Sequence, residues 1–286
     1  MTEPLLPQQI APVSRHQAAL TRRYLQGQPD ALFTYFLNLR TEVDGKLASV
    51  LPPAGGKPYP YGRCEEITRT LFSQLAARLR YPADPIESAI RAFVSNGGIV
   101  RTVWGALRGR YFQNALQFGA LYIDVSNDTV VVTKPKVEIL PMAESGMESL
   151  RDLSHFSEIA AIYWGATLWA NTLVPSLAPL LPLISASPGR LAPGLQSAGD
   201  YMIALMCRDE FRQAETWLHD GPAPPPEIAA TILCTLPEDL RPKTTNGRRE
   251  AVDACRSART AGHTENGAWR ADRVKDFLRL MEARGN

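Results

Sequence analysis

The sequence predicts an α+β protein that is rich in helices and has a small, mainly antiparallel sheet at about residues 99–140. Apolar residues recur at helical spacing on both sides of this segment, so helical N- and C-terminal parts flank it. Only within the segment do short β-branched and aromatic runs follow one another between turn residues. With 286 residues, 45% of them hydrophobic and 21% charged, the chain can bury a sizeable core.

The N-terminal part is predicted to begin with a loose leader, residues 1–14. Two amphipathic helices follow, at 15–26 and 29–50, because apolar residues recur there near helical spacing. Pro52 and Pro53 then stop the second helix and open a turn-rich loop.

Two more helices precede the sheet. The first runs from Cys64 to about Arg80 and carries its apolar residues on one stripe. The second begins at Asp84, whose carboxylate can cap the first turn, with Pro85 in the first helical position. The sequence Asn-Gly-Gly at 96–98 ends it.

The predicted sheet contains one segment with a clear alternation. Leu121, Ile123 and Val125 point to one face, whereas Tyr122 and Asp124 point to the other. The cluster Ser-Asn-Asp at 126–128 predicts a tight turn into a further strand at 129–133, which would complete a hairpin.

The C-terminal part is predicted to be helical. The expected helices cover 147–173, 197–218, 226–235, 246–260 and 266–283. We expect 1–286 to form a single globular unit, with helices and sheet in 15–143 and the helical part in 144–286. The Pro- and Gly-rich run at 220–225 is a candidate soft boundary.

Bulk properties narrow the class of protein. A net charge of +2 lacks the basic footprint of a nucleic-acid protein, so a nucleic-acid partner is not expected. Four scattered cysteines and no visible secretory signal favour a reducing, cytoplasmic environment. Residues 159–189 carry no charge, but prolines in their second half disfavour a transmembrane span and favour a buried helix followed by a proline-rich connection.

The most specific candidate site begins at Cys64. It stands in the first turn of a predicted helix after a glycine loop, in the sequence Tyr-Gly-Arg-Cys-Glu-Glu-Ile of 61–67. The positive end of the helix dipole favours a thiolate at such a position, and a thiolate is the reactive form of cysteine.

This segment resembles the start of the central helix in papain-like and transglutaminase-like cysteine enzymes, and the resemblance covers residues 59–133. It implies acyl transfer or amide hydrolysis on a small-molecule or peptide substrate, without a cofactor or metal. Cys64 would be the nucleophile, Asp124 the orienting acid, and Gln113 or Gln117 a donor beside the oxyanion. The family's histidine is absent from the expected strand, so His155 would have to reach in from the following helix.

Two other hypotheses about function involve the same residues. In the first, Cys64 is a small core residue and the chain is a non-catalytic binding or scaffold protein on the same core. In the second, residues 115–124 resemble a metal-binding stretch of certain glycosyltransferases, which implies a sugar transferase using Asp124 and Asp128. No P-loop, dinucleotide fingerprint, zinc-peptidase motif or serine-hydrolase elbow occurs in the sequence.

Overall fold

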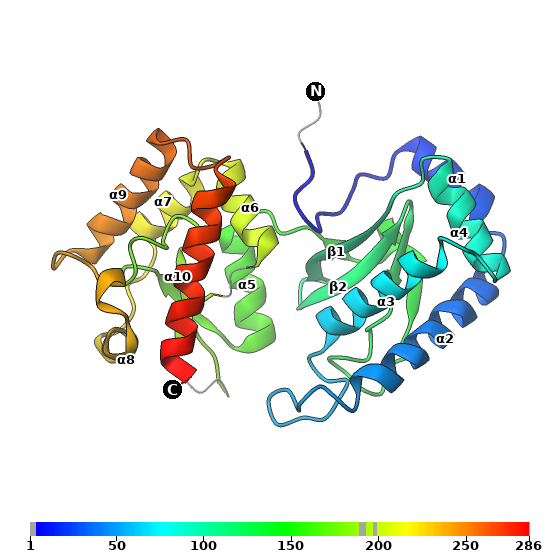
Figure 1. The fold of residues 1–286 in the computed structure, drawn as a ribbon, viewed down its shortest axis with the longest axis horizontal. Coiled ribbons are helices and arrows are strands. Elements are labelled where there is room, and N and C mark those ends of the chain that lie inside the picture. Colours follow the sequence, from blue (N-terminus) through cyan, green and yellow to red (C-terminus); the bar gives the residue numbers. More distant parts are fainter. Residues whose placement is uncertain (1–3, 189–192, 197–198, 286) are drawn as a thin grey trace. The chain divides into compact units, whose positions relative to one another are not determined.

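The computed structural model describes residues 4–188, 193–196 and 199–285 (Figure 1). The chain divides into two compact units, residues 1–149 and 150–286. The sequence analysis predicted one globular unit whose two parts meet at residue 143. The predicted α+β class is confirmed, since both units combine helices with antiparallel strands.

Four helices precede the sheet of the first unit. They are α1 (Arg15–Tyr24), α2 (Pro29–Leu47), α3 (Cys64–Arg78) and α4 (Pro85–Ser95). The predicted start of α4 is confirmed: the Asp84 carboxylate accepts from the backbone N–H of Ile86, Pro85 opens the first turn, and Glu87 completes a capping box.

The sheet of the first unit has five strands in the order β4-β3-β2-β1-β5, and every neighbouring pair is antiparallel. The strands are β1 (Val100–Leu107), β2 (Tyr111–Phe118), β3 (Leu121–Asp124), β4 (Glu138–Pro141) and β5 (Met147–Glu148). A 3-10 turn, η1 (Met142–Glu144), links the last two strands.

The two faces of this sheet have different coverings. Leu116, Ile123 and Val125 pack in one apolar core with Ile67 and Leu71 of α3 and with residues of α2 and α4. The opposite face carries a smaller core, made of Val103, Leu107, Ala115, Tyr122, Met142 and Met147. The predicted alternation along β3 is therefore confirmed, and it decides below which side chains can meet.

The predicted loose leader is held against the sheet over its described part, residues 4–14. The amide of Gln117 accepts from the backbone N–H of Ala11 and donates to its carbonyl, both at 2.8 Å. The carbonyl of Gln8 accepts from the backbone N–H of Trp104 on β1 at 2.9 Å, and Ala11 is only 1% exposed. Polar, Pro-rich residues can thus be ordered by hydrogen bonds to a sheet without leaving a periodic pattern in the sequence.

The strand predicted at 129–133 is also wrong, because this segment forms consecutive turns. The Thr129 hydroxyl donates to the Ser126 carbonyl at 2.7 Å, and the backbone N–H of Lys134 donates to the Val131 carbonyl at 3.0 Å. Three consecutive valines suggested a strand, but these local bonds and Pro135 direct the backbone into turns.

The second unit combines helices with a three-stranded antiparallel sheet. Its strands are β6 (Thr167–Ala170), β7 (Leu183–Ala186) and β8 (Gly194–Leu195), in the order β6-β7-β8. Its helices are α5 (Leu153–Trp164), α6 (Asp200–Arg208), α7 (Arg212–Asp220), α8 (Pro226–Thr235), the 3-10 turn η2 (Glu238–Leu240), α9 (Gly247–Thr260) and α10 (Gly267–Gly285). The sequence analysis predicted a purely helical C-terminal part, and the three strands show that this prediction was wrong.

Two predicted helices of this unit are shorter than expected. The helix predicted at 147–173 is only α5, because the Asp152 carboxylate caps its start and Gly165 ends it in a left-handed conformation. The helix predicted at 197–218 is divided into α6 and α7 by Glu210 and Phe211, which both have positive φ. Residues 197 and 198 themselves lie outside the described residues.

The apolar run at 159–188 contains parts of α5, strand β6, a turn region and strand β7 rather than a long helix followed by a plain connection. Asn171 stabilises the turn region, since its Nδ2 donates to the carbonyls of Val174 and Leu181. Among the described residues, no helix has both the length and the apolar character needed to cross a membrane.

Candidate functional site

A buried polar cluster lies at the end of β3 in the first unit. Asp124 is fully buried, and its two carboxylate oxygens accept several hydrogen bonds. Gln113 Nε2 donates to Oδ2 at 2.8 Å and the Tyr122 hydroxyl donates to the same oxygen at 3.0 Å. The backbone N–H of Ser126 donates to Oδ1 at 2.8 Å, and its hydroxyl lies 3.1 Å from that oxygen.

Burial raises the pKa of Asp124, although the bonds from Gln113, Ser126 and Tyr122 favour the ionised form and offset part of that rise. Burial also raises the pKa of Tyr122 well above its ordinary value, and the neighbouring Asp124 charge adds to the effect. Asp124 is thus surrounded by donors on the strands and by the apolar residues of the smaller core, a setting that suits a structural carboxyl group.

Cys64 lies on the other side of β2. It is the first residue of α3, and Asn114 Nδ2 lies 3.5 Å from its Sγ atom. The other end of the same amide, Asn114 Oδ1, accepts from Gln8 Nε2 at 3.3 Å. Asn114 alternates with Gln113 along β2, so its side chain lies on the face covered by α3, whereas Gln113 points to the face of Asp124.

The environment of the Cys64 thiol favours the protonated form. Burial raises its pKa, the contact with Asn114 opposes this rise, and the negative charges of Asp124 and Glu66 add to it. The position at the head of a helix favours a thiolate, yet burial outweighs that effect here. A thiol in this setting needs a nearby base to become a nucleophile at neutral pH.

The other predicted site residues have separate surroundings. Gln117 is buried. Its Oε1 accepts from the backbone N–H of Ala11, and its Nε2 donates to the carbonyls of Ala11 and Gly119, so the side chain binds the leader segment. His155 belongs to the second unit, where it stands in the first turn of α5 and its Nδ1 accepts from the backbone N–H of Arg151, which precedes that helix. Of the predicted site residues, Gln113 and Asp124 are joined by a direct hydrogen bond, whereas Cys64, Gln117 and His155 each have other partners.

Ser126 connects the two sides of the sheet. Its hydroxyl lies 3.2 Å from the carbonyl oxygen of Asn114 and 3.4 Å from the hydroxyl of Thr68 on α3, in addition to its contact with Asp124. The sequence analysis did not select Ser126, Asn114 or Thr68. A signal was present in β2, where three amide side chains interrupt a strand buried on both faces.

Arg40 is a second buried polar centre that the sequence analysis missed. Its guanidinium is fully buried in the middle of α2 and contacts both oxygens of Asp128, at 2.8 and 3.2 Å. It also donates to the Val125 carbonyl and to Asp44, each at 2.7 Å. An arginine on the apolar stripe between Phe36 and Val43 was the available signal, since a buried charge needs partners.

These contacts bear on the sugar-transferase reading. Asp128 is engaged by Arg40, and Asp124 accepts bonds from protein donors at both oxygens. Among the described residues, no group of three or more His, Cys, Asp and Glu side chains is arranged to hold a metal ion.

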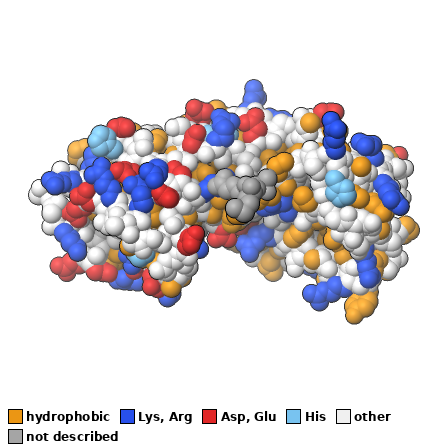
Figure 2. All heavy atoms as spheres, turned by 90° about the horizontal axis from the view of Figure 1, so that it is seen from above, with side chains coloured by type: hydrophobic (Ala, Val, Ile, Leu, Met, Phe, Trp, Pro, Cys, Tyr) orange, Lys and Arg blue, Asp and Glu red, His pale blue; other side chains and the backbone are white. Residues whose placement is uncertain are grey.

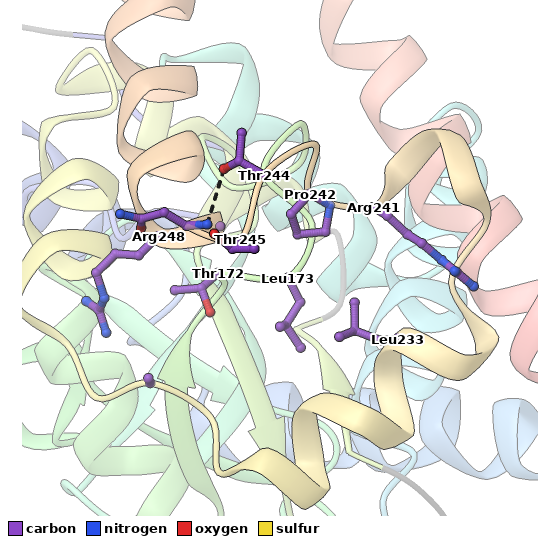
Figure 3. A pocket seen from close by; sticks show the side chains of 11 residues that line it. Thr172, Leu173, Leu233, Arg241, Pro242, Thr244, Thr245 and Arg248 are labelled. Carbon is purple, nitrogen blue, oxygen red and sulfur yellow. Dashed lines mark hydrogen bonds between the residues drawn. The ribbon is translucent and has the colours of Figure 1, made fainter.

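The second unit contains a pocket of about 530 Å³ beside the start of α9 (Figure 3). Arg241 and Arg248 both line it, but their guanidinium groups point away from each other. Arg248 donates to the carbonyls of Leu218, His219 and Gly221, and Arg241 donates to that of Leu236. Because both arginines donate to backbone carbonyls and point apart (Figure 3), they are not arranged to bind one anion such as a phosphate together.

The surface of the second unit is mixed in charge. Figure 2 shows Lys and Arg side chains interspersed with Asp and Glu side chains over this unit, on the left of the view. Glu215 alone pairs with both Arg256 and Arg259, each at 2.7 Å. These contacts account for Arg256 and Arg259 as side chains that join α9 to α7.

No family model matches the chain, and no curated protein and no solved structure matches it either.

Proposed function

We propose that this chain is a non-catalytic binding protein, in which the polar cluster around Asp124 stabilises the sheet. The observation that carries the proposal is the placement of Cys64 and Asp124 on opposite faces of β2. An acid orients a base and a nucleophile only when all three share one side of a site. The raised pKa of the Cys64 thiol supports the same conclusion.

The reactivity of Cys64 tests this proposal. The folded protein is treated with N-ethylmaleimide at pH 7, with and without a denaturing concentration of guanidinium chloride, and modified peptides are identified by mass spectrometry. We expect Cys64 to react far more slowly than Cys234 in the folded protein and at a similar rate in the denatured protein, because the residue is only partly exposed and burial of the thiol raises its pKa. The exposed Cys234 is the internal control and should react in both conditions.

A second candidate function is cysteine-dependent acyl transfer or amide hydrolysis. The observation in its favour is that Cys64 begins the 15-residue helix α3 with a side-chain amide beside its sulfur, because Asn114 could donate to an acyl oxygen there. The same labelling experiment separates the two. Faster reaction of Cys64 than of Cys234 in the folded protein would refute the non-catalytic proposal and favour the enzyme.

A further inference from the structure

Two segments of the first unit form a surface that we name the basic end: the end of α2 with the loop that follows it, residues 46–63, and the loop of residues 129–136. The backbone N–H of Gly62 donates to the Thr129 carbonyl at 2.9 Å, which joins the loops directly. They meet at one end of the sheet, where α2 runs into the loop before α3 (Figure 1).

The basic end has an unusual composition. It contains all four lysines of the first unit and one arginine, and no Asp or Glu occurs in either loop. Its lysines are Lys46, Lys57, Lys134 and Lys136. The only other lysines of the chain, Lys243 and Lys275, lie in the second unit.

Ion pairs with neighbouring acids leave part of this charge uncompensated. Lys136 pairs with Asp44 at 2.6 Å, and Arg63 pairs with Glu66 at 2.6 Å. Lys46, Lys57 and Lys134 make no ion pair within the described part of the chain, and Lys57 lies over the ring of Tyr61 at 4.1 Å. Three positive charges are thus left to attract an anionic partner.

Aliphatic side chains accompany these charges. Val50 is 69% exposed, Val132 59% and Val131 39%, and all three lie in the two loops. None of them lines the neighbouring groove on α2 and α3, which Lys46 lines together with Glu65 and Glu66. The valines therefore lie outside this groove, and they present apolar surface in the same two segments as the lysines.

We propose that the basic end docks the protein on an anionic lipid surface, with the valines entering the headgroup region and the three lysines contacting lipid phosphates and carboxylates. This names the partner of the binding role proposed above and rests on it. Lysine is a flexible point charge that suits a surface without fixed geometry, whereas an acidic peptide held in place would favour paired arginines. Exposed aliphatic residues next to basic ones bind such a surface in two ways. The aliphatic side chains bury apolar area at the headgroup boundary, and the basic side chains are attracted to anionic headgroups.

Co-sedimentation of the full chain with vesicles tests the proposal. We expect binding to phosphatidylcholine vesicles that contain 30% phosphatidylserine at 0.1 M NaCl, and none to pure phosphatidylcholine. Removal of one lysine near such a surface weakens binding about 5-fold, so Lys57→Ala with Lys134→Ala should weaken it roughly 30-fold. Lys275→Ala, an exposed lysine on α10 that pairs with Asp272, is the matched control and should change nothing.

The valines are tested separately. Val50→Asn with Val132→Asn, which removes apolar surface without adding charge, should weaken sedimentation, whereas Val94→Asn, at a 44% exposed valine on α4, should leave it intact. Absence of binding to the anionic vesicles, or equal losses in the control variants, would overturn the proposal. Binding to polyglutamate that the valine variants do not affect would overturn it in favour of an acidic peptide. The N-ethylmaleimide reactivity of Cys64 is measured independently, so failure of either proposal can be recognised.

Discussion

Replacement of Arg40 should destabilise the first unit more than any exposed charge can. Arg40→Met keeps most of the side-chain volume but removes the guanidinium that contacts Asp128, Asp44 and the Val125 carbonyl. Asp44 keeps its bonds to Lys136 and Tyr59, whereas Asp128 loses the one ion pair that it makes among the described residues. Breaking a buried pair in this way costs about 3–5 kcal/mol, because one charge is left buried without compensation.

The measurement must report the first unit alone. Hydrogen exchange of α2 and β2 peptides in a urea series, followed by mass spectrometry, gives the free energy of unfolding of that unit. The matched control is Arg69→Met, since Arg69 forms an exposed pair with Glu65 at 3.2 Å and should show no measurable change.

A double variant separates the lost pair from lost packing. Arg40→Met with Asp128→Leu replaces both partners by apolar groups, so it should be more stable than Arg40→Met alone. If Arg40→Met lowers the free energy of unfolding by less than about 1 kcal/mol, the reasoning is refuted, because leaving Asp128 buried without its partner would then cost almost nothing.

Three further predictions concern single positions. The raised pKa of Asp124 means that the folded state binds its proton more tightly than the unfolded chain does; the resulting stability is present at acid pH and is lost as the pH rises through the raised pKa. Asp124→Asn should therefore gain stability relative to the wild type as the pH rises above about 4, the ordinary pKa of an aspartate, and a difference in unfolding free energy that does not change with pH would contradict this. Gly105→Ala places a Cβ atom 2.1 Å from the Glu148 carbonyl oxygen, so it should cost about 2 kcal/mol and lower the melting temperature. Gly45→Ala, inside α2 with no atom within 4 Å of the new Cβ, should raise the free energy of unfolding by up to about 1 kcal/mol.

The helices of the first unit could be predicted because their ends carry local signals. Asp84, Pro85 and Glu87 specify the start of α4 without any help from the tertiary fold. The sheet of the second unit could not be predicted in this way. Strands β6 and β7 have four residues each and lie in an apolar run without alternation, where periodicity does not distinguish a strand from a buried helix.

The candidate site shows a similar limit. The alternation in β3 correctly placed Asp124 on the face opposite Ile123. It did not reveal which face α3 would cover, and that choice decides whether Cys64 meets the carboxylate. Residues far apart in sequence, such as Thr68 and Ser126, come together only through this packing.

The segment that joins Gln8 to Trp104 and Ala11 to Gln117 also has a protective role. Strand β1 pairs with β5 only at Ala106 and Leu107, so most of its outer side would otherwise offer hydrogen-bonding groups to another chain. By occupying that side at Trp104, residues 8–11 act as a guard against unwanted strand addition between molecules. Shortening the chain from this end would therefore promote self-association before it affected the helical core.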